Sequence, residues 1–272
     1  MFATTVAVAL FHPSHAGQVQ TTRTIPTVNS LAQFAVVELF TSEGCSSCPP
    51  ADRLAGQLAQ RAEEKRQPIY ILSFHVDYWD YLGWKDPFSD AAYSRRQKQY
   101  ARAIQSRQIY TPQAIVNGTT AFVGSDAQRL KATINHALKQ KADASLTVTI
   151  EPVAKEPVTQ NKRRSEDRIS VTYEVIGQSQ DAVLNLAVVE RGLTKKVTRG
   201  ENQGRTLSHH NVVRLLSTVD LDTNGRGHQR IDLPTGVKRA NASIIAYVQD
   251  STTMAIQAAT RVNLTPVTRV RR

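Results

Sequence analysis

Between residues 34 and 141, mainly apolar runs alternate with apolar residues at helical spacing. The runs at 34–40 and 69–76 predict two strands, the second of which is buried on both faces. Between them, helical spacing predicts a helix that begins near 45–49 and ends near residue 65. Its predicted buried positions are Ala51, Leu54, Ala55, Leu58 and Ala62. Pro49 and Pro50 fit only in its first turn, where a missing N–H loses no partner.

The pattern continues with a helix, a hairpin and another helix. The spacing predicts a second helix over 88–105, with Ser89 as its cap and its Arg and Lys side chains facing solvent. Strands at 114–116 and 120–123 flank Asn117-Gly118, a strong hairpin signal. A third helix is predicted over 126–141. The resulting order is β–α–β–α–β–β–α, in which the helical crossover predicts a parallel first pair of strands.

From residue 144 onward, short alternating runs replace the helical stripes. They predict strands at 146–150, 169–176, 183–189, 193–199, 212–221, 228–233, 243–248 and 255–262. Polar clusters at 161–167, 200–204 and 222–227 separate them. Strands at this spacing are typical of a small antiparallel β-sandwich.

A chain of 272 residues suits about two domains of ordinary size. We therefore predict a signal-like segment and linker (1–30), an α/β domain (31–143), a β-sandwich domain (144–265) and a basic tail (266–272). With no apolar run of about 18 residues, the sequence predicts no transmembrane span. Residues 1–16 resemble a signal peptide without its basic start, which favours a periplasmic or secreted protein.

The formal net charge of +11 raises the question of an anionic partner. The basic residues are scattered along the chain and no nucleic-acid-binding motif accompanies them. We therefore expect a solvated basic surface and no nucleic acid, with loose association with an anionic membrane surface left open.

The candidate chemistry lies at Cys45 and Cys48, the two cysteines of the chain. They follow the first predicted strand and begin the first predicted helix, where free N–H groups and the helix dipole favour a thiolate. We predict Cys45 as the exposed nucleophile and Cys48 as the resolving thiol, with Glu43 opposing thiolate formation if it points inward. A static buried disulfide is the alternative. A copper or zinc site with His75 is the weaker one, so we predict no metal and no cofactor.

Other side chains are expected around the cysteines. Thr111 and Pro112 precede the third strand, and a cis Pro112 would turn the preceding backbone toward the cysteines, where it can pair with an extended substrate. Trp79 and Tyr78 belong to an aromatic stretch that is either a recognition surface or a packed loop.

Proton transfer needs a titratable group beside the thiols. His75 and Asp77 are the candidates for this role. A hydrogen-bonded structural histidine and a helix-capping aspartate explain the two residues equally well. His209 and His210 are expected to be structural or on the surface.

The order of elements, the Cys-x-x-Cys at the first helix and the Thr-Pro before the third strand together match the thioredoxin-fold pattern. The segments ELFTSEGCSSCPPAD (38–52), FHVDYWDYLGWKDPF (74–88), YTPQAIVNG (110–118) and FVGSD (122–126) resemble the family called domain of unknown function 1223. The segment 201–214 is similar to the second domain of that family. The resemblance implies an exported two-domain protein, and it carries over Cys45, Cys48 and Pro112, with His75, Asp77 and Trp79 as motif residues.

These observations give one leading hypothesis and one alternative. The leading hypothesis is an exported thiol–disulfide oxidoreductase-like protein that acts on protein or small-molecule thiols through Cys45 and Cys48. The alternative is a binding or scaffold protein with a static disulfide, or one that holds copper or zinc.

Overall fold

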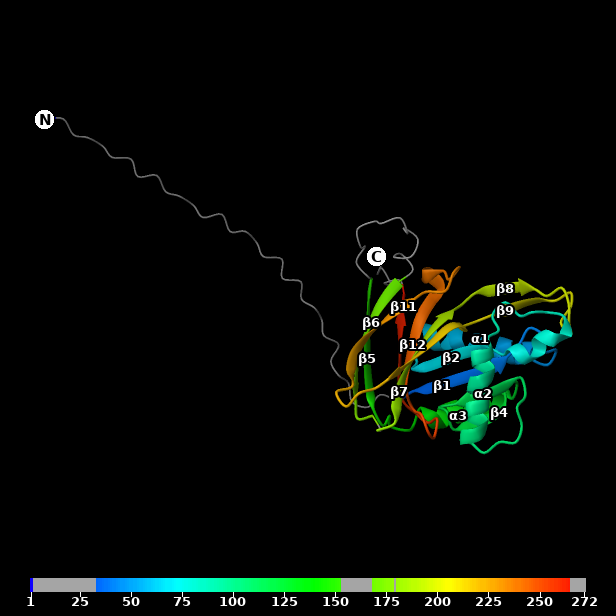
Figure 1. Ribbon diagram of the computed structural model, residues 1–272, viewed down its shortest axis with the longest axis horizontal. Helices are drawn as coiled ribbons and strands as arrows, with labels where there is room; N and C mark the ends of the chain where they lie inside the picture. The colour runs from blue at the N-terminus through cyan, green and yellow to red at the C-terminus, as the bar shows by residue number, and fades with distance from the viewer. Residues whose placement is uncertain (2–32, 153–167, 179, 265–272) are drawn as a thin grey trace.

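The computed structural model describes residue 1 and residues 33–152, 168–178 and 180–264 (Figure 1). The signal-like segment beyond residue 1, the polar cluster at 161–167 and the basic tail at 266–272 lie outside the described residues.

The N-terminal half has the predicted order of elements, with a short 3-10 helix added after the second strand. The elements are β1 (Ala35–Thr41), α1 (Pro49–Glu64), β2 (Ile69–His75), η1 (Asp77–Leu82), α2 (Ala91–Ala103), β3 (Gln113–Val116), β4 (Thr120–Val123) and α3 (Ala127–Ala137). Strands β1 and β2 are parallel, and β3 and β4 form the predicted antiparallel hairpin.

The C-terminal half is built from strands. They are β5 (Ser145–Pro152), β6 (Arg168–Ile176), β7 (Ala182–Glu190), β8 (Leu193–Lys196), β9 (Thr206–His209), β10 (Val212–Asp220), β11 (Arg226–Asp232), β12 (Ala242–Asp250) and β13 (Ile256–Asn263), with the 3-10 helix η2 (Arg239–Asn241) before β12. The sequence pattern missed β9, because its four residues are mostly polar and give no alternating apolar signal.

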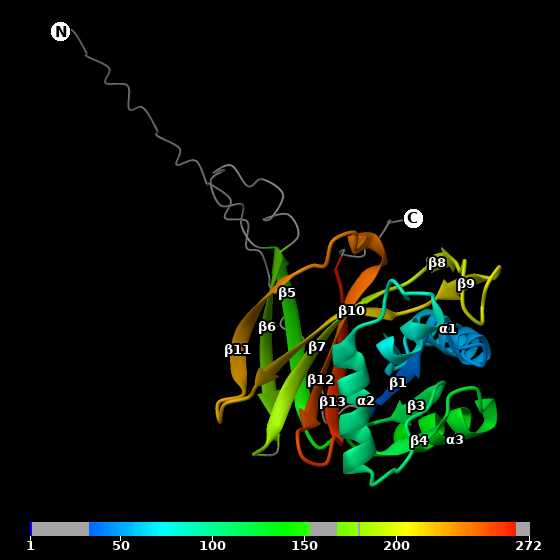
Figure 2. The ribbon, with the colours of Figure 1, turned by 45° about the vertical axis from the view of Figure 1, so that its right-hand side comes forward.

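One large sheet joins the two halves of the chain. Its strand order is β13-β12-β7-β10-β2-β1-β3-β4, and β10 meets β2 in parallel at Val212 and Ser73. The backbone N–H of Ser73 donates to the carbonyl oxygen of Asn211 at 2.9 Å. The strands β11-β6-β5 form a second sheet beside the C-terminal part of the large one (Figure 2). The protein therefore has a mixed α/β fold with a large sheet and few helices, and the expected β-sandwich shares its larger sheet with the N-terminal strands.

Both faces of β1 are covered, which explains its mainly apolar sequence. Val36 and Phe40 pack in the cluster that includes Tyr93 and Tyr100 of α2. Val37 and Leu39 pack in the cluster formed with α1 and α3. The sheet thus lies between α2 on one face and α1 and α3 on the other.

Two expectations for the second helix were wrong. Asp90 rather than Ser89 caps α2, because its side chain accepts a hydrogen bond from the backbone N–H of Ala92. Arg96 is 6% exposed and does not face solvent. Its Nε and Nη2 atoms each donate to a carboxylate oxygen of Glu38 at 2.7 Å. The buried carboxylate of Glu38 in the middle of β1 requires a charged partner. Arg96 therefore lies inside the protein, although arginine is usually exposed to solvent.

Candidate functional site

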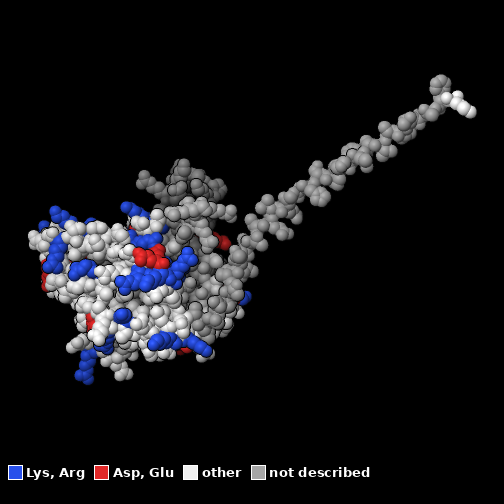
Figure 3. All heavy atoms as spheres, turned by 180° about the vertical axis from the view of Figure 1, so that it is seen from behind, with Lys and Arg blue, Asp and Glu red and all other residues white. Residues whose placement is uncertain are grey.

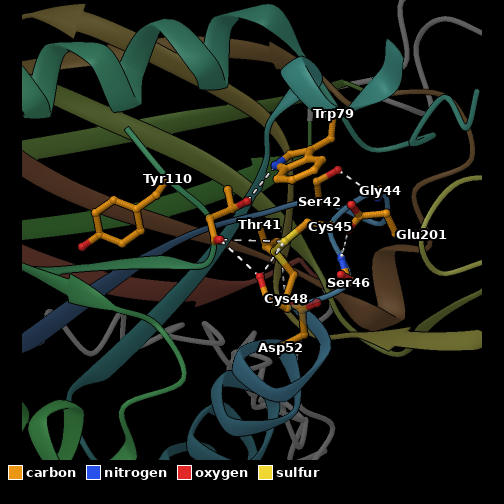
Figure 4. Close-up of a disulfide and its surroundings, with 12 residues drawn as sticks. Thr41, Ser42, Gly44, Cys45, Ser46, Cys48, Asp52, Trp79, Tyr110 and Glu201 are labelled. Atoms are coloured by element: carbon orange, nitrogen blue, oxygen red, sulfur yellow. Dashed lines mark hydrogen bonds between the residues drawn. A yellow bond between two sulfur atoms is a disulfide. The ribbon is translucent and has the colours of Figure 1, made fainter. Parts of the chain in front are cut away.

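The two cysteines form a disulfide where β1 passes into α1 (Figure 4). Their Cα atoms are 5.4 Å apart, and Cys48 is the N-cap residue of α1. The prolines at positions 49 and 50 occupy the first turn, as the sequence predicts. The disulfide thus lies at the positive end of the helix dipole.

Both cysteines are buried, with 1% exposure for Cys45 and none for Cys48. The prediction that Cys45 is exposed was therefore wrong. Residues from the connection between β8 and β9 bind the backbone of the cysteine loop. The side-chain amide of Asn202 donates to the carbonyl oxygens of Glu43 and Cys45, both at 2.9 Å. A carboxylate oxygen of Glu201 accepts from the backbone N–H of Ser46 at 2.9 Å.

Three of the predicted substrate-binding residues lie beside the disulfide. The Thr111–Pro112 peptide bond is cis, and the carbonyl oxygen of Thr111 is 3.8 Å from Cys45 Sγ. The hydroxyl of Ser47 lies 3.2 Å from Cys45 Sγ and 3.5 Å from that carbonyl oxygen. Trp79 Nε1 donates to Thr111 Oγ1 at 2.7 Å. The Thr-Pro loop is therefore held against Cys45 from two sides.

The other predicted residues have different surroundings. The hydroxyl of Tyr78 donates to Gln97 of α2 at 3.2 Å and also interacts with the side chain of Thr111. The backbone N–H of Asp77 donates to the hydroxyl of Ser94 at 3.2 Å, and that hydroxyl donates back to the Asp77 carboxylate. Tyr78 and Asp77 therefore bind the second helix, whereas His75 is fully buried beneath the cysteine loop.

His75 belongs to a buried group of five titratable residues that we call the acid–histidine cluster. Its members are Glu43, Asp52, His75, Asp86 and His209. Two imidazole–carboxylate pairs form its centre: His75 Nδ1 with Asp86 at 2.7 Å, and His209 Nε2 with Glu43 at 2.8 Å. The two imidazole rings contact each other edge to face, with centroids 4.9 Å apart.

The cluster ties three loops together under the disulfide. The backbone N–H of Glu43, in the cysteine loop, donates to the carboxylate of Asp86 at 2.8 Å. Trp84 Nε1 donates to the carboxylate of Glu43 at 2.8 Å. His209 brings in the end of β9. Glu43 thus points inward, where it is fully buried and bonded on both carboxylate oxygens.

Electrostatics favour a charged pair at His75 and Asp86. Burial alone would lower the pKa of His75, but Asp86, assisted by Asp52 and Glu43, raises the pKa above its ordinary value. Burial alone would raise the pKa of Asp86, but His75 and backbone N–H donors lower it. Each group thus stabilises the charged form of the other.

Asp52 is a site residue that the sequence analysis did not select. It is 7% exposed and lies one helical turn after Cys48, where it accepts from Thr41 Oγ1 at 2.7 Å (Figure 4). Burial raises the pKa of Asp52, and His209, His75 and Thr41 offset this only in part. The available signal was a carboxylate between Ala51 and Ala55 on the predicted apolar face.

We expect Asp52→Asn to stabilise the oxidised protein by about 1 kcal/mol at pH 8. The folded-state pKa of Asp52 is raised, so ionisation of this group destabilises the native state as pH rises above the ordinary value of 3.8. The gain should therefore shrink as pH falls toward 3.8. Urea unfolding of both proteins from pH 8 to pH 4 measures it, and a gain independent of pH would contradict the assignment.

Glu201, Asn202 and His209 were also absent from the predicted site. They come from around the unpredicted strand β9, so no local pattern placed them beside the cysteines. His209 is buried in the acid–histidine cluster, and the ring of His210 lies against Gly56 of α1. Within the described ranges, no three His, Cys, Asp or Glu side chains are grouped to hold a metal ion.

Basic and acidic side chains are interspersed on the surface of the protein. On the face shown in Figure 3, Lys and Arg side chains stand in separate groups with acidic side chains between them. Throughout the described part of the chain, each helix is too short or too polar to cross a membrane.

The fold and site define a mixed α/β protein with a buried disulfide at the start of its first helix. The profile of the family described as a protein of unknown function (DUF1223) matches residues 36–249. The chain belongs to this family. No curated protein matches it significantly.

The chain is also similar to solved structures. The crystal structure of protein AGR_C_4864 from Agrobacterium tumefaciens is 25% identical, with a TM-score of 0.61, over 89% of this chain and 99% of that one. A domain of the outer membrane lipoprotein Omp28 from Porphyromonas gingivalis is 12% identical, with a TM-score of 0.26, over 45% of this chain and 88% of that one. The second similarity is too weak to carry an argument.

Proposed function

We propose that this protein is an exported thiol–disulfide oxidoreductase-like protein with a thioredoxin-like N-terminal half. Its Cys45–Cys48 pair would exchange with protein or small-molecule thiols. The observation that carries the proposal is the disulfide at the start of α1, with the carbonyl oxygen of Thr111 3.8 Å from Cys45 Sγ. A helix start stabilises a thiolate, and an adjacent extended backbone can pair with a substrate strand.

The arrangement of the N-terminal strands supports the thioredoxin-like assignment. Their order is β2-β1-β3-β4, with β1 parallel to β2 and antiparallel to β3. Helices α1 and α3 pack on one face and α2 on the other. The parallel pair β1–β2 and the antiparallel pair β3–β4 are the two pairings that the order of elements in the sequence predicts.

In the proposed exchange, a substrate thiolate attacks Cys45 Sγ and the bond to Cys48 Sγ breaks. Cys48 leaves as a thiolate and takes up a proton, and a second substrate thiol then releases Cys45 as the substrate becomes a disulfide. Two electrons pass from the dithiol to the protein. Asp52, with its raised pKa and its place one turn after Cys48, is the proton donor that we assign. His75 would influence the protonation of Asp52 through its charge in the acid–histidine cluster.

The test is the reduction of insulin disulfides by dithiothreitol with and without the protein. We expect Cys45→Ser to lower the protein-dependent rate at least 100-fold, since without this sulfur no mixed disulfide forms. Ser251→Ala, in an exposed turn far along the chain, is the control and should keep the wild-type rate. A wild-type rate of insulin reduction with Cys45→Ser would contradict the proposal.

Burial of both cysteines favours a second candidate, a scaffold with a static disulfide. Redox titration in glutathione buffers separates the two functions. A pair that stays oxidised over the whole range of these buffers supports the scaffold.

We infer a periplasmic or secreted location from the signal-like segment and the disulfide, since such bonds persist in oxidising compartments. Fractionation of cells that produce the full chain tests this.

A further inference from the structure

The connection that covers the disulfide belongs to a separate two-stranded unit. Among the described residues, strands β8 and β9 pair with each other alone and form no ladder with the eight-stranded or three-stranded sheet. We call residues 193–209 the cover hairpin. A two-stranded hairpin is marginally stable alone, so its position depends on side-chain contacts with the body of the protein.

Those contacts are concentrated at the cysteine loop. Asn202 has no exposed surface, and its amide spans the carbonyl oxygens of Glu43 and Cys45. Glu201 accepts from the backbone N–H of Ser46. These three hydrogen bonds link segments more than 150 residues apart in sequence, and they hold the hairpin tip against the backbone of the cysteine loop.

The base of the hairpin is anchored separately from its tip. His209, at the end of β9, is 2% exposed and paired with Glu43, and Leu207 of the same strand is buried. Residues 203–206, by contrast, are exposed. The tip can therefore separate from the cysteine loop by breaking the bonds of Asn202 and Glu201 while the base stays in place.

We propose that the tip of the cover hairpin is a gate, and that it must open before any thiol can attack Cys45. In the closed state, Cys45 Sγ is shielded from solvent. The carboxylate of Glu201 also accepts from the Ser46 N–H, one residue from Cys45, so its negative charge disfavours a Cys45 thiolate. The closed gate thus favours the disulfide over the reduced pair. This inference rests on the proposed exchange at Cys45–Cys48 and adds its regulation.

The test measures access alone, with dithiothreitol as the sole reductant of the oxidised protein. Dithiothreitol supplies two electrons, becomes a cyclic disulfide and leaves two protein thiols. We expect Asn202→Ala to be reduced about tenfold faster than the wild type, because the variant lacks two hydrogen bonds that stabilise the closed state. Asn224→Ala, in an exposed turn at the far end of β10, is the matched control and should react at the wild-type rate.

Hydrogen exchange at the Ser46 amide provides a second readout, since Glu201 holds this N–H in the closed state. In Asn202→Ala, the amide should exchange faster by the same factor as the reduction. Glu201→Gln keeps an acceptor oxygen and removes the charge, so it should shift the dithiothreitol equilibrium two- to threefold toward the reduced pair. If Asn202→Ala does not fold, Glu201→Gln is the variant that tests the gate.

Equal reduction rates for wild type and Asn202→Ala, with Ser46 exchange unchanged, would overturn the gate. An unchanged equilibrium in Glu201→Gln would overturn the part assigned to its charge. Neither result depends on turnover of insulin. A protein that passes these tests but fails in the insulin assay has a gated disulfide and not the proposed activity.

Discussion

Glu38→Ala is expected to lower the free energy of unfolding by about 3–5 kcal/mol. Glu38 is 1% exposed in the middle of β1, and its carboxylate accepts two hydrogen bonds from Arg96 and one from Tyr100. Its removal leaves the Arg96 guanidinium, which stays charged, buried without a counter-ion. Gln249 of β12 also accepts from Arg96 at 2.9 Å, so the loss reaches the C-terminal strands.

Urea unfolding followed by circular dichroism measures this effect. The matched control is Glu174→Ala, which removes the carboxylate of an exposed ion pair with Arg226 and should cost at most about 1 kcal/mol. A double variant, Glu38→Leu with Arg96→Met, should recover much of the loss, because it removes both buried charges. Equal losses for Glu38→Ala and Glu174→Ala would contradict the role of the buried pair.

Glu43→Ala is expected to cost about 3 kcal/mol and to loosen the cysteine loop at the same time. Its carboxylate accepts from Trp84 Nε1 and pairs with His209 Nε2, so its loss leaves polar atoms of both side chains without their partner. The base of the cover hairpin would lose its anchor. Reduction of the disulfide by dithiothreitol should therefore become faster, in addition to the loss of stability.

Glu201→Ala provides the comparison for Glu43→Ala. Both residues are glutamates that bond within the same site, but Glu201 is exposed and Glu43 is fully buried. We expect Glu201→Ala to change the free energy of unfolding by less than about 1 kcal/mol. If unfolding curves showed the two variants to be equally destabilised, the acid–histidine cluster would not be the element that holds the loop.

The two predictions concern residues that bind distant parts of the chain. Glu38 joins β1 to α2 and, through Arg96, to Gln249, and Glu43 joins the cysteine loop to the end of β9. Together with the backbone pairing of β2 and β10, these contacts connect the halves that the sequence pattern separates at residue 143. A change near the disulfide is therefore expected to affect both halves.

The sequence by itself determined the order of elements from β1 to α3, the start of α1 at the two prolines and the place of the cysteine pair there. These features depend on spacing within a few residues, which reports whether one side of a segment is buried. The same spacing detected eight of the C-terminal strands. It missed β9, whose polar residues carry no such pattern.

Only the tertiary structure decided the burial of Cys45, the inward position of Arg96 and the sharing of one sheet by both halves. It also decided the approach of Asn202 and His209 to the cysteine loop. Each of these depends on partners that are 58 to 166 residues apart in sequence. These partners pair because buried charged and polar groups require hydrogen-bond partners. Local periodicity contains no information about such partners, so the cover over the disulfide became visible only in three dimensions.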